Sequence, residues 1–146
     1  MTDRTSNPEQ DRIRATIQDL GRAIGAKDAE RVMACYAPDA IHFSLAPPLR
    51  SGPANVTDLE SWFATWEGPI GIEAKDLRIM TDGEIAMATS LIRMTGVKTD
   101  GEMVDLWYRA TLGLRKIDGR WKIVHEHESV PFYMDGSYKA AIDLVP

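Results

Sequence analysis

Apolar residues recur at the spacing of one helix face near the start of the chain. Residues 7–10 read Asn-Pro-Glu-Gln, a pattern typical of a helix start, because Asn caps, Pro suits the first position and Gln completes a capping box. We therefore predict a helix from about residue 8 to Gly25, since glycine favours a helix end. Its apolar face consists of Ile13, Ile17, Leu20 and Ile24.

A second helix and a short strand are predicted next. Asp28 is expected to cap the helix, and Pro38 is expected to end it. The strand covers residues 41–45, and the prolines at 47–48 break it.

A third helix is predicted before residue 70. The capping-box pattern of residues 57–60 begins it. The Gly-Pro pair at 68–69 ends it. Its apolar face consists of Leu59, Trp62, Phe63 and Trp66.

Asp-Gly pairs divide the second half of the chain at positions 82–83, 100–101 and 118–119. Such a pair between apolar runs is a strong signal of a β-hairpin. Consecutive strands joined in this way form an antiparallel meander, and long strands favour a bent, twisted sheet. The predicted strands cover residues 72–80, 85–97, 103–117 and 120–130.

The strand over residues 85–97 is apolar on both faces, whereas a sheet with one solvated face alternates cleanly. We expect the helices to cover one face and a second copy of the chain to cover the other, which predicts a homodimer through the outer sheet face. An uncovered apolar outer surface is the alternative. The two faces carry Ile85, Met87 and Leu91, and Ala86, Ala88, Ile92 and Met94.

Length and composition indicate one α+β domain, with helices first and an antiparallel sheet after them. The chain has 146 residues, of which 44% are hydrophobic and 27% charged, and this length buries a core without disulfides or metals. We expect residues 1–7 to be a disordered lead-in, residues 8–133 the domain, and residues 134–146 a C-terminal tail.

The charge pattern argues against two classes of partner. The net charge is −5 at pH 7 and no basic stripe is present, so a nucleic-acid partner is not expected. An anionic membrane surface would repel the chain, and no apolar run reaches membrane-spanning length. Cys35 is the single cysteine, so an internal disulfide is excluded and a cytoplasmic location is expected.

Three segments resemble one known superfamily. They are Ala-Lys-Asp at 26–28 followed by Tyr-Ala-Pro-Asp-Ala at 36–40, residues 115–121, and Val-His-Glu-His-Glu-Ser-Val-Pro at 124–131. The pattern is similar to the NTF2-like superfamily, and in particular to its SnoaL-like and ketosteroid-isomerase-like branch. The resemblance implies a cone in which three N-terminal helices pack on a strongly curved antiparallel sheet and enclose a cavity.

The resemblance does not extend to the ketosteroid isomerase mechanism. That mechanism uses an aspartate base, with a tyrosine and a protonated aspartate for the oxyanion. The matching positions here are Ser44 for the base, Leu20 for the tyrosine, and Thr111 or Leu112 for the second aspartate. None of these side chains performs the required task, so isomerisation of steroids by that mechanism is rejected.

The resemblance also implies which polar residues face the cavity. His42 is expected there as a general acid or base. Arg93 is expected to anchor a ligand carbonyl or carboxylate, with Glu126 and Glu128 beside it as partners or proton shuttles. A purely structural Arg–Glu pair is the alternative. The expected pocket walls are Tyr36, Ser44, Trp62, Trp66, Tyr108 and Leu112.

The direction of the last strand is open between two interpretations. The resemblance sends Glu126 and Glu128 inward. Hydrophobicity argues the opposite, because Trp121 and Ile123 share a face with the histidines at 125 and 127 in a regular strand. A β-bulge could switch the register partway.

No metal or cofactor is expected. The histidines at 125 and 127 share a face, but the third ligand, His42, is expected on the other side of the sheet. Neither a phosphate-binding glycine loop nor a Gly-x-Ser-x-Gly nucleophile motif occurs. We therefore expect acid–base chemistry, such as isomerisation, dehydration or aldol-type cyclisation, on a small apolar oxygen-bearing ligand. The alternative is a ligand-binding or assembly domain without turnover.

Overall fold

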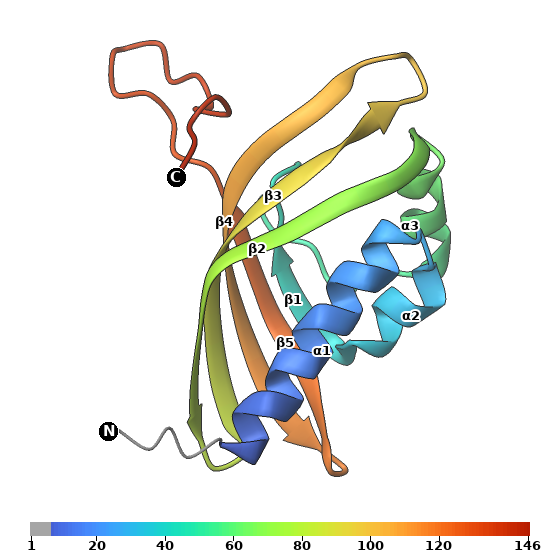
Figure 1. Ribbon diagram of the computed structural model, residues 1–146, viewed down its shortest axis with the longest axis vertical. Coiled ribbons are helices and arrows are strands. Elements are labelled where there is room, and N and C mark those ends of the chain that lie inside the picture. Colours follow the sequence, from blue (N-terminus) through green and yellow to red (C-terminus); the bar gives the residue numbers. More distant parts are fainter. Residues whose placement is uncertain (1–6) are drawn as a thin grey trace, which may run out of the picture.

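The structure, a computed structural model, describes residues 7–146. Of the predicted lead-in, residues 1–6 lie outside the described residues. Two helices come first along the chain, strand β1 lies between the second and third helices, and four long strands follow (Figure 1). The elements are α1 (Pro8–Gly25), α2 (Ala29–Ala34), β1 (Tyr36–Phe43), α3 (Val56–Phe63), β2 (Trp66–Asp82), β3 (Ile85–Lys98), β4 (Met103–Ile117) and β5 (Arg120–Ser129).

The predicted helix starts at Asn7 and Asp28 are confirmed. The Asn7 side chain accepts hydrogen bonds from the backbone of Glu9 and Gln10, and the Asp28 side chain accepts one from Arg31. These bonds satisfy amide groups that the first helical turn leaves without partners.

The predicted bounds of two elements are wrong. Helix α3 is capped by Asn55, whose side chain accepts from the amide of Asp58, and it ends at Phe63. Trp66 therefore does not belong to α3. It begins β2, because it pairs with Lys98 across the sheet. Strand β1 likewise starts at Tyr36, earlier than predicted, because Tyr36 pairs with Ile123.

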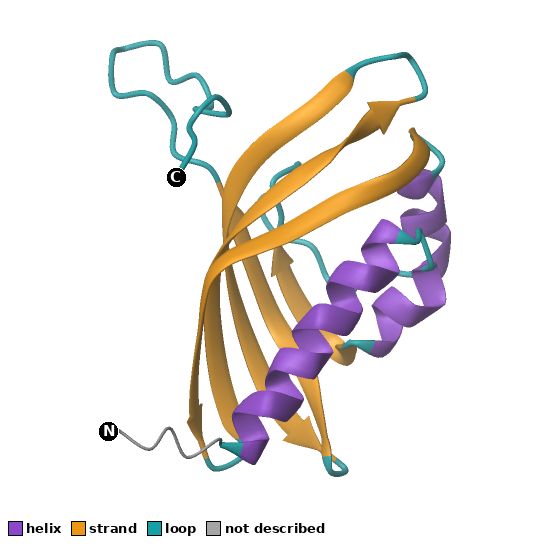
Figure 2. Ribbon diagram, in the orientation of Figure 1, coloured by secondary structure: helices purple, strands orange, loops and turns teal. Residues whose placement is uncertain are grey.

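The sheet has the strand order β1-β5-β4-β3-β2. Strands β2 to β5 form the predicted antiparallel meander, and β1 joins its edge parallel to β5. The sheet bends strongly, and α1 to α3 cover its concave face (Figure 2). The distal halves of β2, β3 and β4 extend as an arm that bends toward α3 (Figure 1).

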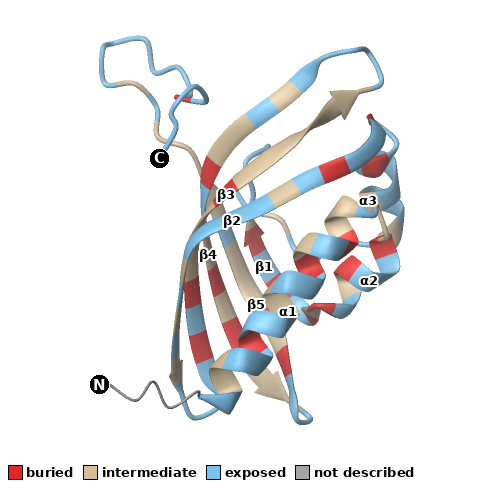
Figure 3. Cartoon of the chain, in the orientation of Figure 1, coloured by how far each residue is buried: buried red, intermediate tan, exposed pale blue. Residues whose placement is uncertain are grey.

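The core lies between the helices and the lower part of the sheet, where buried residues of α1, β4 and β5 face one another (Figure 3). A polar contact closes one end of it. Glu9 accepts hydrogen bonds from Trp121 Nε1 at 2.7 Å and from Lys116 Nζ at 3.2 Å. These two bonds, led by that of Trp121, lower the pKa of Glu9. The start of α1 is thereby tied to the β4–β5 hairpin.

The outer face of the sheet exposes several large apolar side chains, among them Met80, Ile85 and Met87. The homodimer through this face stays a prediction. None of the helices within residues 7–146 is long and apolar enough to cross a membrane.

Gly96 allows the benzene edge of the Trp66 indole to approach β3 closely. A Cβ atom at Gly96 would lie 2.8 Å from Cζ3 and 2.9 Å from Cε3 of Trp66. Overpacking of this kind costs about 1–3 kcal/mol. We therefore expect Gly96→Ala to lower the free energy of urea unfolding by that amount. Gly113→Ala is the control, because its Cβ would meet its nearest neighbour at an ordinary 3.5 Å. Equal stability of the two variants would contradict the packing argument.

Candidate functional site

A cavity of about 540 Å³ lies between the helices and the concave face of the sheet. Most of its wall is apolar, with contributions from all three helices and all five strands. The predicted wall residues Tyr36, Ser44, Trp62, Trp66 and Tyr108 line it. So do His42, Glu126 and Glu128, the predicted polar residues.

A bulge in β5 brings the two glutamates into the cavity. Leu114 of β4 pairs with Ile123, and the preceding residue, Gly113, pairs with His125. Val124 is therefore an extra residue without a partner in β4, and alternation along β5 reverses there. Trp121 and Ile123, which are 4% and 0% exposed, point into the core before the bulge. The glutamates point to the same side after the bulge. The interpretation from hydrophobicity is therefore right for the residues before the bulge, and the one from the resemblance is right for the residues after it.

The histidines of β5 lie on the opposite face from the glutamates. The rings of His125 and His127 pack edge-on against Phe43, with centroids 4.9 and 5.4 Å away. His125 Nδ1 also lies 2.9 Å from the carbonyl oxygen of Ile41. The histidines therefore face outward, as the resemblance implies.

The two glutamates and a tyrosine form a connected polar group. The Tyr36 hydroxyl donates a hydrogen bond to Glu126 Oε2, and Glu128 follows two residues later on the same face of β5. Burial, followed by the charge of Glu126, raises the pKa of Glu128 well above its ordinary value. Two carboxylates cannot both ionise at low cost in apolar surroundings. Of the two carboxyl groups, Glu128 is therefore the one whose proton is held to higher pH than that of an ordinary glutamate.

The tyrosines of the cavity stay protonated. Burial raises the pKa of Tyr36, with a further contribution from the charge of Glu126. Burial raises the pKa of Tyr108 too. Both hydroxyl groups are therefore hydrogen-bond donors at the carboxyl end of the cavity.

His42 lies beside this polar group. It is 7% exposed, and its Cα pairs with that of Glu126 across the parallel β1–β5 ladder. Its ring centroid is 4.8 Å from that of Tyr36. Within the described part of the chain, His42 Nε2 has no hydrogen-bond partner. Because an unpaired buried polar atom is costly, a ligand atom that pairs with it gains affinity.

The predicted cavity position of Arg93 is wrong. Its guanidinium is 40% exposed and forms a two-pronged ion pair with Asp105, at 2.8 and 2.9 Å, with Glu73 at 4.0 Å. Side chains alternate along a strand, and Met94 and Leu106 of the adjacent rung line the cavity. Arg93 therefore points to the outer face. The predicted pair of Arg93 with the β5 glutamates is replaced by the pair with Asp105.

Leu112 also departs from its predicted place. It is buried in the core cluster between α1 and the sheet rather than in the cavity wall. Lys98 was not predicted, although it lines the cavity. The signal for it was present, because Met94, Gly96 and Lys98 alternate along the buried face of β3.

Comparisons with known proteins agree with this architecture. The family model of the SnoaL-like domain matches residues 13–133. Among curated proteins, none matches this chain. An NTF2-like protein of unknown function from Pseudomonas putida KT2440 is 31% identical, with a TM-score of 0.85 over 97% of this chain and 99% of that one.

Two more distant solved structures share the fold alone. A proposed scytalone dehydratase from Novosphingobium aromaticivorans is 20% identical, with a TM-score of 0.75 over 92% of this chain and 91% of that one. An NTF2-like superfamily protein from Salmonella enterica is 17% identical, with a TM-score of 0.75 over 89% of this chain and 96% of that one.

The raised pKa of Glu128 predicts how stability depends on pH. The unfolded chain loses this proton near the ordinary pKa of 4.5, whereas the folded protein keeps it to higher pH. Ionisation therefore favours the unfolded state, and stability falls as the pH rises from about 4.5 through the folded-state pKa. We expect Glu128→Gln, which stays neutral, to gain stability relative to the wild type between about pH 5 and 8 in urea unfolding.

Glu60→Gln is the control for this prediction, because Glu60 lies exposed on α3. Its stability difference from the wild type is expected to stay flat over the same range. A flat difference for Glu128→Gln as well would show that Glu128 is ionised in the folded protein.

Proposed function

Because the chain belongs to the SnoaL-like domain family, we propose that its cavity binds a small, largely apolar ligand and removes water from it by acid–base chemistry. The ligand carries a hydroxyl group on the carbon β to a carbonyl. This assignment rests on one observation, the meeting of a buried carboxyl group with a raised pKa, Glu128, with a buried histidine, His42, at the same end of an apolar cavity.

Dehydration needs two proton transfers, and the residues at this end are suited to both. A base removes a proton from the carbon next to the carbonyl, and an acid protonates the leaving hydroxyl group. Histidine exchanges protons near neutral pH. A carboxylic acid kept neutral by an apolar environment is an effective donor there.

In the proposed reaction, His42 takes the proton from the α-carbon, and the electron pair of that C–H bond forms the new C=C bond. The C–O bond to the hydroxyl group breaks, and this oxygen leaves as water with the proton of Glu128. The Tyr108 hydroxyl donates a hydrogen bond to the carbonyl oxygen and stabilises the negative charge that gathers on it. The proton on His42 then returns to the carboxyl pair, which restores the starting state.

Each of the remaining residues at this end has a supporting task. Tyr36 donates to Glu126, which keeps that carboxyl group in position beside Glu128. Ser44 and Trp62 contribute to the wall. A water-poor cavity strengthens these electrostatic interactions, because little solvent screens them.

The test uses 4-hydroxy-4-phenyl-2-butanone, whose loss of water gives a conjugated ketone with near-ultraviolet absorption. We expect the wild-type protein to accelerate this reaction. Because general acid–base groups contribute about 10²–10⁴-fold, His42→Ala and Glu128→Gln should each lower kcat by that factor.

His127→Ala is the matched control, because His127 lies on the opposite face of β5 and should leave kcat unchanged. Wild-type activity that survives in both cavity variants would exclude these residues as acid and base. Saturable binding of the ketone without turnover would instead favour a ligand-binding domain without catalysis.

A further inference from the structure

The end of the cavity remote from the glutamates carries a positive charge. Glu128 lies across from Ala110 of β4, which pairs with Ser90 of β3. Lys98, which also lines the cavity, lies eight residues farther along β3 than Ser90. At about 3.3 Å per residue, this is roughly 26 Å of strand. The cavity therefore has two distinct polar ends.

The ammonium group of Lys98 is held in place by two contacts, and some of its N–H donors have no partner among the described residues. Its Nζ lies 4.0 Å from the centre of the Trp66 ring and 2.9 Å from Thr65 Oγ1. Thr65 Oγ1 itself donates to the carbonyl oxygen of Trp62 at 2.6 Å. An ammonium group has three N–H donors, and Thr65 takes one of them. Among the described residues, no carboxylate lies within 4.0 Å of Lys98.

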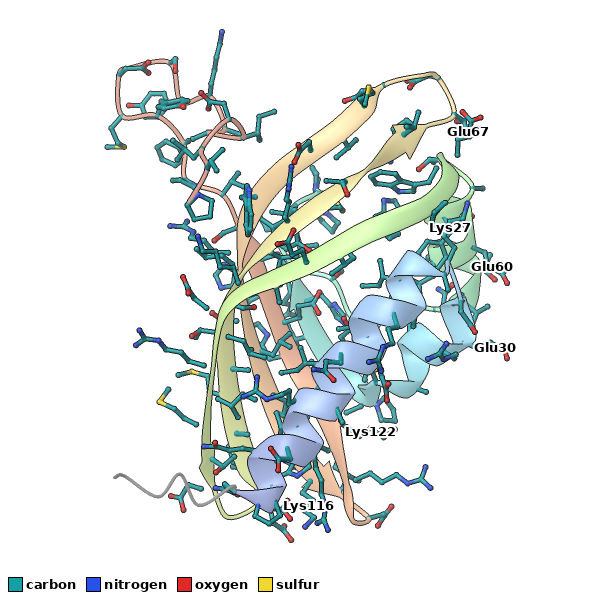
Figure 4. All side chains as sticks on the ribbon, viewed as in Figure 1. Lys27, Glu30, Glu60, Glu67, Lys116 and Lys122 are labelled. Carbon is teal, nitrogen blue, oxygen red and sulfur yellow. The ribbon has the colours of Figure 1, made fainter. Side chains whose placement is uncertain are left out.

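The carboxylates near Lys98 do not pair with it. Asp100 and Glu102, two and four residues farther along the chain, are exposed, and the Asp100 carboxylate accepts a hydrogen bond from the amide of Glu102. Glu67 follows Trp66 in β2, and Glu60 lies on α3. Both are exposed and are directed outward from the end of the arm and from α3 (Figure 4). Among the described residues, the positive charge of Lys98 therefore has no carboxylate partner and is available to a ligand in the cavity.

Trp66 provides a second donor at this end. Its indole Nε1 is buried and has no hydrogen-bond partner within residues 7–146. The Cε3–Cζ3 edge of the ring lies against Gly96. Because Nε1 is on the opposite edge of the indole, it points away from β3. An unpaired buried N–H group costs about 1–3 kcal/mol, so a ligand acceptor here is favoured.

Between the two ends the wall is apolar. It consists of side chains that offer no hydrogen bond, among them Met33, Leu59, Met94, Val104 and Leu106. A ligand that fits this distribution has an oxygen-bearing group at one end, an apolar middle and a negatively charged acceptor at the other.

From this arrangement, and resting on the proposed function, we propose that the substrate carries a carboxylate at the end remote from the reacting hydroxyl group. One carboxylate oxygen accepts from Lys98 Nζ, and the other accepts from Trp66 Nε1. Lys98 is in this view a specificity-determining residue. It selects the charged member among ligands of equal length and shape.

The test compares two probes of equal length, 6-phenylhexanoate and 6-phenylhexanamide, by isothermal titration calorimetry. Charge-assisted hydrogen bonds are roughly twice as strong as neutral ones, so we expect the wild type to bind the carboxylate at least about tenfold more tightly. Lys98→Met should reduce this preference to about one, with the affinity for the amide unchanged. Lys98→Arg should keep a preference for the carboxylate.

Lys75→Met is the matched control, because Lys75 is an exposed lysine of β2 that does not line the cavity, and it should keep the wild-type preference. Equal binding of the two probes by the wild type, or a preference that survives in Lys98→Met, would overturn the inference. Circular dichroism checks that each variant is folded.

A second measurement does not depend on the Lys98 variants. The indole N–H signal of Trp66 in a ¹H–¹⁵N spectrum, assigned with Trp66→Phe, should move on addition of the carboxylate to the wild type. A signal that does not move would also overturn the inference.

The outcomes separate this inference from the proposed function. If the hydroxyketone is dehydrated but neither probe binds with a preference, the carboxylate end is wrong and the proposed function stands. If the carboxylate preference depends on Lys98 but no hydroxyketone is dehydrated, the charge assignment stands and the catalytic proposal fails.

Discussion

The one residue of β5 that has no partner in β4, Val124, governs the chemistry of the cavity. Because side chains alternate along a strand, an unbroken β5 would bury Trp121 and Ile123 only by sending the histidines into the cavity and the glutamates out. The bulge at Val124 lets the same strand bury an apolar pair in the core and then present an acidic pair to the cavity. The core and the site thus place opposite demands on one strand, and the extra residue satisfies both.

The acidic pair constrains everything around it. Two carboxyl groups two residues apart on one face share an apolar space, which raises the pKa of Glu128, while Glu126 accepts a hydrogen bond from Tyr36. This arrangement reduces stability at neutral pH relative to a pair of neutral side chains. A cost of this kind is usual at sites where function, rather than stability, determines the side chains.

Much of the fold could be predicted from local pattern. The caps at Asn7 and Asp28 and the Asp-Gly turns have local physical causes, and they located α1, the start of α2, and the hairpins. Trp66 was misplaced because its spacing from Trp62 fits a helix, whereas its pairing with Lys98, thirty-two positions away, decides its structure. Long-range pairing of this kind leaves no trace in local periodicity.

The site was only partly predictable, because long-range strand pairing also decides which side chains enter the cavity. His42, Glu126 and Glu128 were placed by resemblance, while the bulge that directs the glutamates depends on the pairing of two strands. The predicted direction of Arg93 was wrong, although the alternation of side chains along β3 indicates the correct one. Met94 and Ala88 share the inward face by alternation, and an arginine one position away from Met94 has to point outward.

One indole connects parts of the molecule that do not otherwise meet. The benzene edge of Trp66 rests on Gly96, and its ring lies beneath the cation of Lys98. The backbone carbonyl oxygen of Trp66 accepts a hydrogen bond from Lys27 of the α1–α2 turn. Neither Gly96 nor Lys27 lines the cavity, yet a change at either one moves the ring that limits the cavity's length. Ligand preference can thus diverge between related proteins through positions that never touch the ligand, while the acid–base end stays intact.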